Sequence, residues 1–502
     1  QGAPWSCTVR MRRPEGTGEL TLRGVVRDAH DRVLARAETV CPAGSGQAAL
    51  ALSLPRPLTV SHSLDLELLD GARPVAFHRE RFTLQPPYPL DDFTVLMWSY
   101  AGAPPVLRRT DRLCFAWGAD MMDLCHMGGY SAEAAAREYD LSSRSGLRLV
   151  PYVTRLAGSA DAQHRRQPGL REPETVARTR DALRTTCAQA APYAPVAYTL
   201  GDENYLFRGD GEVCHRPESV AAFQVWLQGQ YGTIAALNRT WGTDHPGFDA
   251  IAPPLLADAA AHTASLAPWI DHKRFMDEEF ALAHERFAEV IHEVDPGALV
   301  GWDGFLGHTW RSGYDFARLT AHLRLNQTYT SNWPQGEFVR SFKQPGALTG
   351  MWGNATADTE DGWRAFPWAC LLQGDNSVWW WTSWGLEYIP FNPDLSRSLY
   401  GTWFFDAVRE LKDGIGRLLL RADRDARIAV LYSQPDLFAL TIAQAMAPDC
   451  ALGGDRELLR EYAAAFRAIL DAGSQFEAVT AAQVASGRLQ DQIGRASCRE
   501  RV

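Results

Sequence analysis

The stretch Val196-Ala-Tyr-Thr-Leu-Gly-Asp-Glu-Asn204 decides how the rest of the chain is interpreted. Its first five residues are apolar or β-prone, as in a buried strand, and the stretch then ends in Gly201, Asp202 and Glu203. Two adjacent carboxylates at the end of a buried strand are costly unless that end opens into a polar site. In a barrel of parallel strands, the carboxyl ends of the strands carry the chemistry. Glu203 is therefore the first candidate for a catalytic acid, and the alternative is a strand that runs into an acidic surface turn.

A second motif follows within residues 217–243, which include Phe223-Gln-Val-Trp-Leu227 and Tyr231-Gly-Thr-Ile-Ala-Ala-Leu-Asn-Arg-Thr-Trp-Gly-Thr243. Together with the strand that ends in Glu203, this ordered pattern resembles glycoside hydrolase family 42, the bacterial β-galactosidase type. In that family a strand ends in Asn-Glu, and a helix later comes a segment of the form Phe-x-x-Trp-Leu…Tyr-Gly-x-Ile-x-x-Leu-Asn-x-x-Trp-Gly-Thr. Asp202 stands where the family usually has Asn.

The resemblance implies a retaining β-glycosidase that acts on a carbohydrate without a cofactor, with Glu203 at the position of the acid/base residue. It also implies a homo-oligomer, which in this family is a trimer. The acid/base must hold its proton near neutral pH, and burial or a nearby negative charge such as that of Asp202 favours this. Because neighbours on a strand point to opposite faces, Asp202 is alternatively expected to face the barrel wall and pair with a basic group.

Length and composition limit the class of protein. A chain of 502 residues suggests two or three domains, and its 46% hydrophobic and 22% charged residues are typical of a globular protein. The net charge of −10 disfavours binding to nucleic acid or to an acidic membrane surface. No apolar run approaches the roughly 20 residues that span a bilayer. The composition leaves the compartment open between cytoplasm and export.

The nine cysteines are scattered, and none forms a Cys-x-x-Cys pair, so the sequence gives little support to a structural zinc site and no metal is expected. Cys7 and Cys41 are expected either to pair, if the protein is exported, or to remain buried free thiols.

Residues 1–88 are predicted to form an antiparallel β-sandwich domain. Several short runs alternate apolar and polar residues with period two, and turn signals such as Asp70-Gly71 separate them. We interpret this domain as structural rather than sugar-binding, because Trp5 is one of few aromatic residues available to stack on a sugar. The predicted strands are 19–26, 33–40, 48–54, 64–69 and 75–84.

Residues 92–422 are predicted to form a (β/α)8 barrel, because strand patterns there alternate with helical patterns. The central strand at 196 is the fourth of eight on this count. The other predicted strands are 93–100, 113–117, 147–153, 299–302, 325–329, 347–352 and 377–382. The predicted helices are 131–139, 174–190, 220–231, 268–294, 314–323 and 363–372.

Residues 423–490 begin a new β–α–β pattern, with strands at 426–432 and 476–479 and a helix at 457–471. This pattern resembles the start of the flavodoxin-like second domain of family 42. Residues 491–502 resemble a non-native tail, and we expect them to make few contacts with the folded body.

A retaining glycosidase needs a second carboxylate about 5–5.5 Å from the first. In family 42 it is a glutamate at the end of the seventh strand, but residues 346–354 contain no carboxylate. Asp303, at the end of the fifth strand, is the first candidate because adjacent strand ends lie close together. Glu360 is the second, with Asp358 and Asp361 in the same loop.

Strand-end position also selects substrate-binding candidates around the predicted barrel mouth. At least one of the tryptophans at the eighth strand, Trp379, Trp380, Trp381 and Trp384, is expected to lie under a sugar, while alternation implies that some of them are core. His215, His308 and Asp120 are further rim candidates, and the pair Asp271-His272 is interpreted as structural. The predicted substrate-binding residues are Asp202, Asn204, Trp302, Tyr329, Trp352, Trp381 and Trp384.

Three functions follow from these patterns. The first is a retaining hydrolase of β-linked glycosides. The second is an altered, glycan-binding barrel that lacks the usual nucleophile. The third is an inverting hydrolase, in which the two carboxyl groups lie about 6.5–9.5 Å apart. The separation between Glu203 and the other carboxylates in the mouth distinguishes them.

Overall fold

The computed structural model describes residues 4–489 except 55–56, 58, 87, 89, 100–120, 126–131, 145–146, 210, 263, 354–358, 382–387, 393, 395, 425 and 449–453. The predicted site residues Asp120, Asp358 and Trp384 and the predicted tail 491–502 lie outside the described residues.

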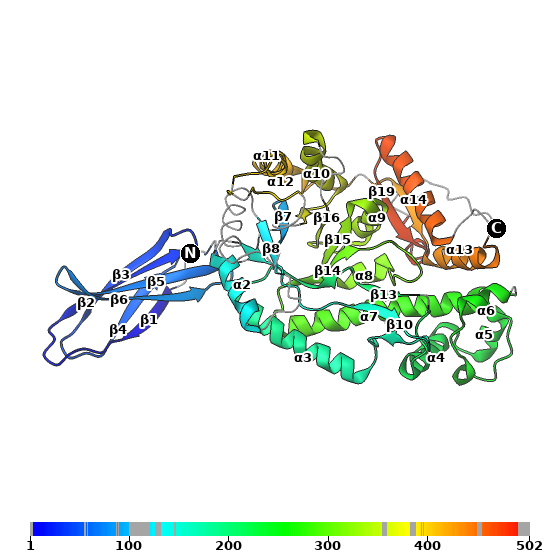
Figure 1. Cartoon of the computed structure of the whole chain (residues 1–502), viewed down its shortest axis with the longest axis horizontal. Helices are drawn as coiled ribbons and strands as arrows, with labels where there is room; N and C mark the ends of the chain where they lie inside the picture. The colour runs from blue at the N-terminus through cyan, green and yellow to red at the C-terminus, as the bar shows by residue number, and fades with distance from the viewer. Residues whose placement is uncertain are drawn as a thin grey trace.

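The N-terminal region forms two antiparallel sheets at one end of the molecule (Figure 1). One has the order β3-β2-β5-β6 and the other pairs β1 with β4. Alternate residues of β2 are buried, and they meet alternate residues of β4 in a shared core that includes Leu22, Leu50 and Leu64. Cys7 and Cys41 are free thiols. The strands are β1 (Pro4–Arg10), β2 (Leu20–Asp28), β3 (Val33–Cys41), β4 (Gln47–Ser53), β5 (Ser61–Asp70) and β6 (Arg73–Thr83).

The central region contains an eight-stranded sheet in the order β12-β14-β15-β16-β17-β7-β8-β9, and every neighbouring pair is parallel. The predicted α/β class with a parallel sheet is confirmed. The second strand of this sheet along the chain is 121–125, and the predicted strand at 113–117 lies outside the described residues. The strands are β7 (Thr94–Ser99), β8 (Met121–Cys125), β9 (Arg148–Leu149), β12 (Ala197–Asp202), β14 (Leu299–Phe305), β15 (Leu325–Tyr329), β16 (Leu348–Trp352) and β17 (Ser377–Trp380).

The two ends of this sheet are joined. Val196 N donates to Leu149 O at 2.9 Å, and Val153 N donates to Thr199 O at 3.0 Å. Tyr152 and Thr199 form a parallel bridge. Inside the sheet lies an apolar cluster drawn from the strands and the residues beside them, while larger clusters fill the space between the strands and the helices.

Helices cover the outer face of the sheet (Figure 1). A small sheet, β11-β10-β13, lies beside the carboxyl end of β12 and was not predicted from the sequence. Among the described helices, none has an apolar stretch long enough to cross a lipid bilayer. The helices are α2 (Ala132–Arg144), α3 (Pro173–Ala190), α4 (Pro217–Tyr231), α5 (Ile234–Trp241), α6 (Leu256–Ala261), α7 (Ala267–Val294), α8 (Phe316–His322), α9 (Trp333–Phe342), α10 (Glu360–Gln373), α11 (Leu399–Asp413) and α12 (Gly416–Leu419). The small strands are β10 (Ala157–Ala160), β11 (Arg166–Gln167) and β13 (Tyr205–Arg208).

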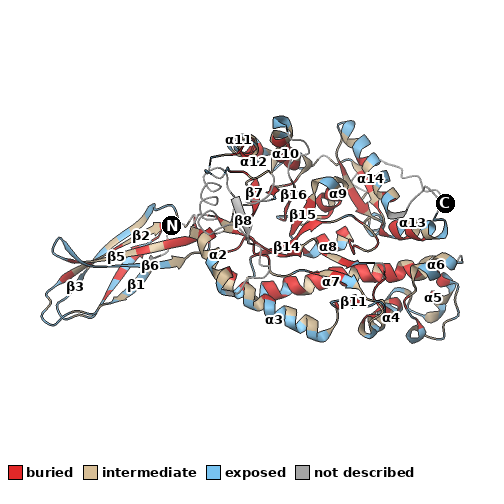
Figure 2. Ribbon diagram, in the orientation of Figure 1, coloured by how far each residue is buried: buried red, intermediate tan, exposed pale blue. Residues whose placement is uncertain are grey.

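Helix α7 is buried along much of its length (Figure 2). The motif of residues 217–243 anchors α4 and α5 to it. Asp271 of α7 accepts hydrogen bonds from Tyr231 Oη at 2.5 Å and Trp241 Nε1 at 3.0 Å, and Trp226 Nε1 donates to Glu278 at 3.1 Å. These contacts agree with the structural interpretation of the pair Asp271-His272.

The C-terminal region packs on the same core. The ring of Tyr432 lies 4.8 Å from that of Phe338, and Gln434 Nε2 donates to Asp277 Oδ2 at 2.6 Å. Parallel strands and helices alternate here as predicted, with the addition of α13. The elements are β18 (Ile428–Tyr432), α13 (Gln434–Met446), α14 (Gly454–Asp471), β19 (Phe476–Thr480) and α15 (Ala481–Ala485).

A buried ion network ties α9 to the segment before β17 and to the chain that leads into β18. Arg340 contacts Glu337 at 2.6 Å and Asp375 at 2.8 Å, and all three side chains are at most 2% exposed. Arg424 contacts the other oxygen of Glu337 at 2.9 Å. The neighbouring arginines hold the pKa of Glu337 below its ordinary value despite its burial.

We predict that Arg340→Ala lowers the free energy of unfolding by about 3–5 kcal/mol, because it removes the arginine that pairs with buried Asp375 and one of the two arginines that pair with buried Glu337. The control Arg318→Ala removes an arginine that is 48% exposed and pairs with Glu278 and Asp315, and should cost less than about 1 kcal/mol. Urea unfolding of both variants measures the difference. Equal losses would contradict the prediction.

Candidate active site

The end of β12 brings two neighbouring carboxyl groups to one hydroxyl. The pairing of β12 with β14 shifts register between Thr199 and Asp202, and Gly201 and Glu203 have φ of +129° and +50°. Adjacent residues of a regular strand point to opposite faces, and this irregular turn removes that alternation. Tyr329 Oη therefore lies 3.3 Å from Asp202 Oδ1 and 3.1 Å from Glu203 Oε1.

Gly304, after Asp303 on the neighbouring strand, makes room for this arrangement. Its φ is +69°, and a Cβ at this position would lie 2.6 Å from both Asp202 Oδ1 and Tyr329 Oη. Only glycine allows both the backbone conformation and the close approach.

The carboxyl group of Asp202 has a pKa above its ordinary value. Burial, followed by the charge of Glu203, raises the pKa of Asp202 to about 7, against the opposing effects of Arg155 and the Tyr329 hydrogen bond. Its side chain lies on the Tyr329 side of the strand. The expectation that it faces the wall and pairs with a basic group is therefore wrong, because the irregular strand end redirects it.

Glu203 has a different environment. Its side chain is 30% exposed, and Arg155 Nη2 and Arg208 Nη2 lie 3.5 and 3.6 Å from its Oε2. The guanidinium of Arg208 also lies over the ring of Tyr205, 4.1 Å from its centroid. Sequence reasoning missed both arginines, because nothing in their local pattern distinguishes them from surface residues.

Asp303 lies in register with Asp202 on β14 and is completely buried. Neither of its carboxyl oxygens makes a hydrogen bond of normal geometry with the residues that the structure describes. Burial, followed by the charge of Asp202, holds its pKa well above the ordinary value, against a weaker contribution from Thr199. With no exposed surface, Asp303 is out of reach of a substrate in this structure.

Asn204 fastens the strand end to α7. It is fully buried, its Oδ1 accepts from Leu156 N at 2.9 Å, and its Nδ2 contacts Leu200 O at 3.1 Å and His284 Nε2 at 3.0 Å. His284 Nδ1 contacts Phe280 O at 2.8 Å, and burial lowers the pKa of His284 to about 3. The imidazole is therefore neutral, with Nε2 as acceptor, and the Asn204 amide is used within the fold.

Arg166 stabilises the small sheet β11-β10-β13, which lies beside the carboxyl groups of Asp202 and Glu203. Its guanidinium is buried among backbone carbonyls of both neighbouring strands and donates to Leu206 O at 2.5 Å and Leu156 O at 2.7 Å. Gly158 lies so close that a Cβ there would be 2.5 Å from the guanidinium carbon. Since Arg155 precedes β10 and Arg208 ends β13, this packing positions the two arginines at Glu203.

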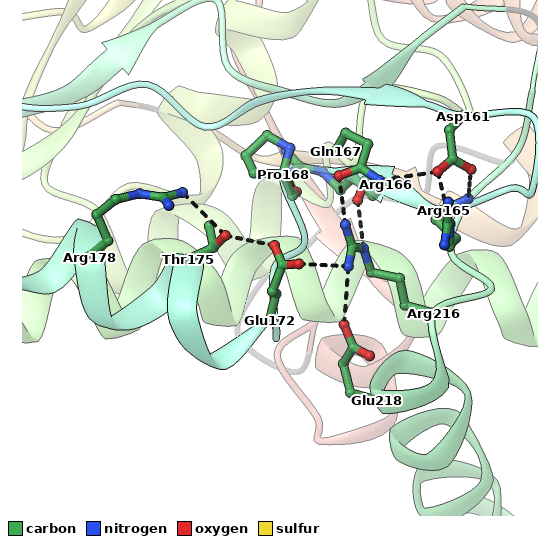
Figure 3. Close-up of polar contacts among 10 residues, drawn as sticks. All are labelled: Asp161, Arg165, Arg166, Gln167, Pro168, Glu172, Thr175, Arg178, Arg216 and Glu218. Carbon is green, nitrogen blue, oxygen red and sulfur yellow. Dashed lines mark hydrogen bonds and ion pairs between the residues drawn. The ribbon is translucent and has the colours of Figure 1, made fainter.

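Arg216 makes polar contacts with the segment that contains Arg166 and with two glutamates (Figure 3). It donates to Arg166 O at 2.9 Å and to Gln167 Oε1 at 2.6 Å, and it contacts Glu172 at 2.9 Å and Glu218 at 3.8 Å. The network joins β11, which carries Arg166, to the starts of α3 and α4.

Aromatic side chains line the same end of the sheet. The ring of Trp98 lies 5.4 Å from Trp352 and 5.1 Å from Trp381, and Trp352 lies 4.8 Å from Trp379. Trp381 is 39% exposed, whereas Trp98, Trp352 and Trp379 are buried. Of these four, Trp381 is the one available to stack on a sugar. The sequence analysis did not select Trp98, although it lies next to the carboxyl end of β7, the first strand of the parallel sheet along the chain.

Several other candidates lie elsewhere. Trp302 is fully buried on the helix side of β14, with its ring 4.3 Å from that of His284. His308 is buried against Gln434, and its Nε2 lies 3.0 Å from Gln434 Oε1. Glu360 is exposed at the first turn of α10, as is Asp361, and His215 is half-buried.

Comparison with known proteins places this site in context. The glycoside hydrolase family 42 model, described as beta-galactosidase, matches residues 194–348. A beta-galactosidase of Arthrobacter sp is 37% identical over 102 residues, which are 18% of this chain and 14% of the relative. One of Thermus thermophilus is 30% identical over 92 residues, 17% of this chain and 14% of the relative.

Solved structures extend the likeness of fold. Gan42B, a family 42 beta-galactosidase from G. stearothermophilus solved as a catalytic mutant, has a TM-score of 0.60 at 15% sequence identity. The match covers 77% of this chain and 65% of the Gan42B chain. The beta-galactosidase of Marinomonas ef1 has a TM-score of 0.56 at 14% identity, covering 77% and 70%.

Fold and site together define a class: an α/β protein with a carboxylate site at the carboxyl end of a parallel sheet. Within that class, the segment 194–348, which contains Asp202, Glu203, Asp303 and Tyr329, is of the glycoside hydrolase family 42 type. The resemblance predicted from residues 196–243 is confirmed.

We predict that Asp202→Asn gains stability relative to the wild type as pH rises from about 4 to about 7. The folded-state pKa of about 7 lies above the ordinary value of about 3.9, so the unfolded chain ionises first and the wild type loses stability across this window. Asn does not titrate. Urea unfolding at a series of pH values measures the difference between the two proteins.

The matched control is Asp181→Asn, at a side chain that is 80% exposed on α3. Its stability difference from the wild type should stay constant over the same range. A constant difference for Asp202→Asn as well would contradict the raised pKa.

Proposed function

We propose that this protein is a glycoside hydrolase that cleaves β-linked galactosides or closely related β-glycosides with retention, using Glu203 as a catalytic carboxyl group. The observation that carries the proposal is the pair Asp202 and Glu203 on the hydroxyl of Tyr329. The pair lies at the carboxyl end of a parallel sheet, where enzymes of this architecture act, and within the segment matched by family 42. No cofactor is part of the proposal.

The domain organisation belongs to the same proposal. The parallel sheet of residues 92–422 is a (β/α)8 barrel, preceded by a β-sandwich domain at 1–88 and followed at 423–490 by the start of a flavodoxin-like domain. Trp381 supplies the exposed indole for the C–H face of a pyranose. The partner is a carbohydrate, and the oligomer implied by the family is a trimer.

A second function competes with the first, because β16 ends without the carboxylate that the family carries there. A glycan-binding barrel that has lost hydrolysis would retain Trp381 and the polar groups of the mouth. It would bind β-galactosides and turn none of them over.

We predict that Glu203→Gln lowers kcat/KM for aryl β-galactosides by about 10²–10⁴-fold, the range that a positioned acid–base group contributes. The control Glu174→Gln, in the first turn of α3, should keep wild-type activity. Unchanged activity of Glu203→Gln would contradict the proposal. Sugar binding by the wild type without turnover of any β-glycoside would instead favour the glycan-binding function.

A further inference from the structure

We propose that Arg155 and Arg208 bind an acidic group on the leaving-group side of the substrate. The preferred substrates are then β-galactosides whose neighbouring sugar carries a carboxylate or a sulfate ester. The inference rests on the proposed hydrolase function and names the substrate class of the same site.

Both guanidinium groups are open to solvent and are held loosely. The side chain of Arg155 is 44% exposed and that of Arg208 is 55% exposed. Their Nη2 atoms lie 3.5 and 3.6 Å from the same oxygen, Glu203 Oε2, whereas a tight charge-assisted hydrogen bond measures about 2.7–2.9 Å. Within the described part of the chain, neither arginine forms another ion pair. A guanidinium has several N–H donors, so most of them stay available to an incoming anion.

Positive charge is in excess at this edge of the site. Glu203 contributes at most one negative charge, whether or not it holds its proton, and two guanidinium groups face it. Burial raises the pKa of Asp202 to about 7, so below that pH Asp202 adds little negative charge. The chain as a whole has a net charge of −10, so the local excess has the opposite sign to the rest of the molecule. Such an excess favours the binding of an anion at this edge.

The backbone at both arginines is fixed by close packing. A Cβ on Gly201 would lie 2.8 Å from Arg155 Cα, so the chain at Arg155 packs directly on the end of β12. Arg208 is in register with Ser159 where β13 pairs with β10, and its guanidinium carbon lies 4.1 Å from the centroid of the Tyr205 ring. Donors that are already positioned lose less conformational entropy on binding than freely rotating ones, so this packing favours a binding role.

The two arginines lie across the site from the exposed indole. In the eight-stranded sheet, whose two ends are joined, β12 and β17 are separated by three strands in either direction. Trp381 follows β17, whereas Arg208 follows β12 by way of β13 and Arg155 follows β9 beside β12. The family resemblance gives Glu203 the acid/base position, which protonates the leaving oxygen. A group bound against Glu203 Oε2 therefore belongs to the leaving group, while the galactose ring stacks on Trp381.

A pair of matched disaccharides tests the inference: galactosyl-β-1,4-galacturonic acid and its uronamide, in which a neutral amide of the same shape replaces the carboxylate. The measured quantity is the ratio of kcat/KM for the acid to kcat/KM for the amide, and the wild type should prefer the acid. Arg155→Gln and Arg208→Gln should each lower this ratio about tenfold, the effect expected when one charge-assisted hydrogen bond is lost. Arg208→Lys, which keeps the charge without the planar fork, should lower it less.

The control is Arg184→Gln, at an arginine of α3 that is 41% exposed and lies 2.8 Å from Glu293. Its ratio should equal that of the wild type. Because the two disaccharides share the cleaved bond, a disturbance of Glu203 lowers both values of kcat/KM and cancels in the ratio. Equal losses on the acid and the amide would show that the arginines act through Glu203 alone and would overturn the inference.

The wild type offers a test that needs no variant. Raising NaCl from about 0.05 M to about 0.5 M should lower the ratio several-fold, because salt screens the attraction between exposed charges. A ratio that does not respond to salt would overturn the inference.

Further substrates identify the acidic group and its side. Galactosyl-β-1,4-galactose 6-sulfate, compared with the unsulfated disaccharide, distinguishes a sulfate ester from a carboxylate by which pair shows the larger loss of preference in Arg208→Gln. p-Nitrophenyl β-galacturonide carries its carboxylate on the cleaved sugar. An arginine-dependent preference for it over p-nitrophenyl β-galactoside would overturn the placement on the leaving-group side.

The proposed function and the substrate class fail in different ways. A wild type that turned over no β-glycoside would overturn the proposed function and the substrate class with it. Turnover of both disaccharides with a ratio that does not depend on the arginines would overturn the substrate class alone.

Discussion

Two neighbouring carboxyl groups held at the end of one buried strand are the constraint around which this molecule is built. A regular strand would send Asp202 and Glu203 to opposite faces. The chain instead shifts register, places Gly201 and Glu203 at positive φ and leaves a glycine at position 304 facing the pair. A non-glycine residue at positive φ costs of order 1–3 kcal/mol, so the surrounding structure must stabilise this conformation.

That stabilisation comes from distant parts of the chain. Asn204 is fastened to His284 on α7, and the carbonyl of Asn204 accepts a hydrogen bond from Tyr314 Oη at 2.6 Å. The buried guanidinium of Arg166 ties together the strands on either side of it. The family motif at 217–243 contributes indirectly, because it packs α4 and α5 against the helix that carries His284. The motif is therefore a signature of the scaffold rather than of the reacting groups.

The two carboxyl groups of the pair lie in different electrostatic environments. Arginines reach Glu203 from the loop before β10 and from the end of β13, whereas the side-chain hydrogen bond that Asp202 receives within the described part of the chain comes from the Tyr329 hydroxyl. Sites that combine acid and base chemistry depend on such a difference in environment. Asp303, in register with Asp202 on β14, adds a buried carboxyl group whose pKa burial and the charge of Asp202 hold well above its ordinary value.

The local pattern of apolar and polar residues was enough to predict many of the strands and helices. Alternation with period two located five of the six N-terminal strands, and strand–helix alternation located seven of the eight strands of the parallel sheet, because these periodicities follow directly from burial of one face. The strand predicted at 113–117 lies outside the described residues, and the strand β8 at 121–125 was not predicted. The carboxylates at the end of β12 and the importance of Tyr329 were also visible from strand-end position.

By itself, then, the sequence determined the α/β class, the family resemblance and Glu203 as the leading acidic group. Only the tertiary structure decided that Asp202 shares a hydroxyl with Glu203, that Asp303 is sealed from solvent, and that Arg155 and Arg208 flank the site. It also decided that Trp381 is exposed while Trp352 and Trp379 are core. The physical reason is that exposure and electrostatic environment depend on contacts between residues far apart in the chain, whereas periodicity records only which face of its own element a residue occupies.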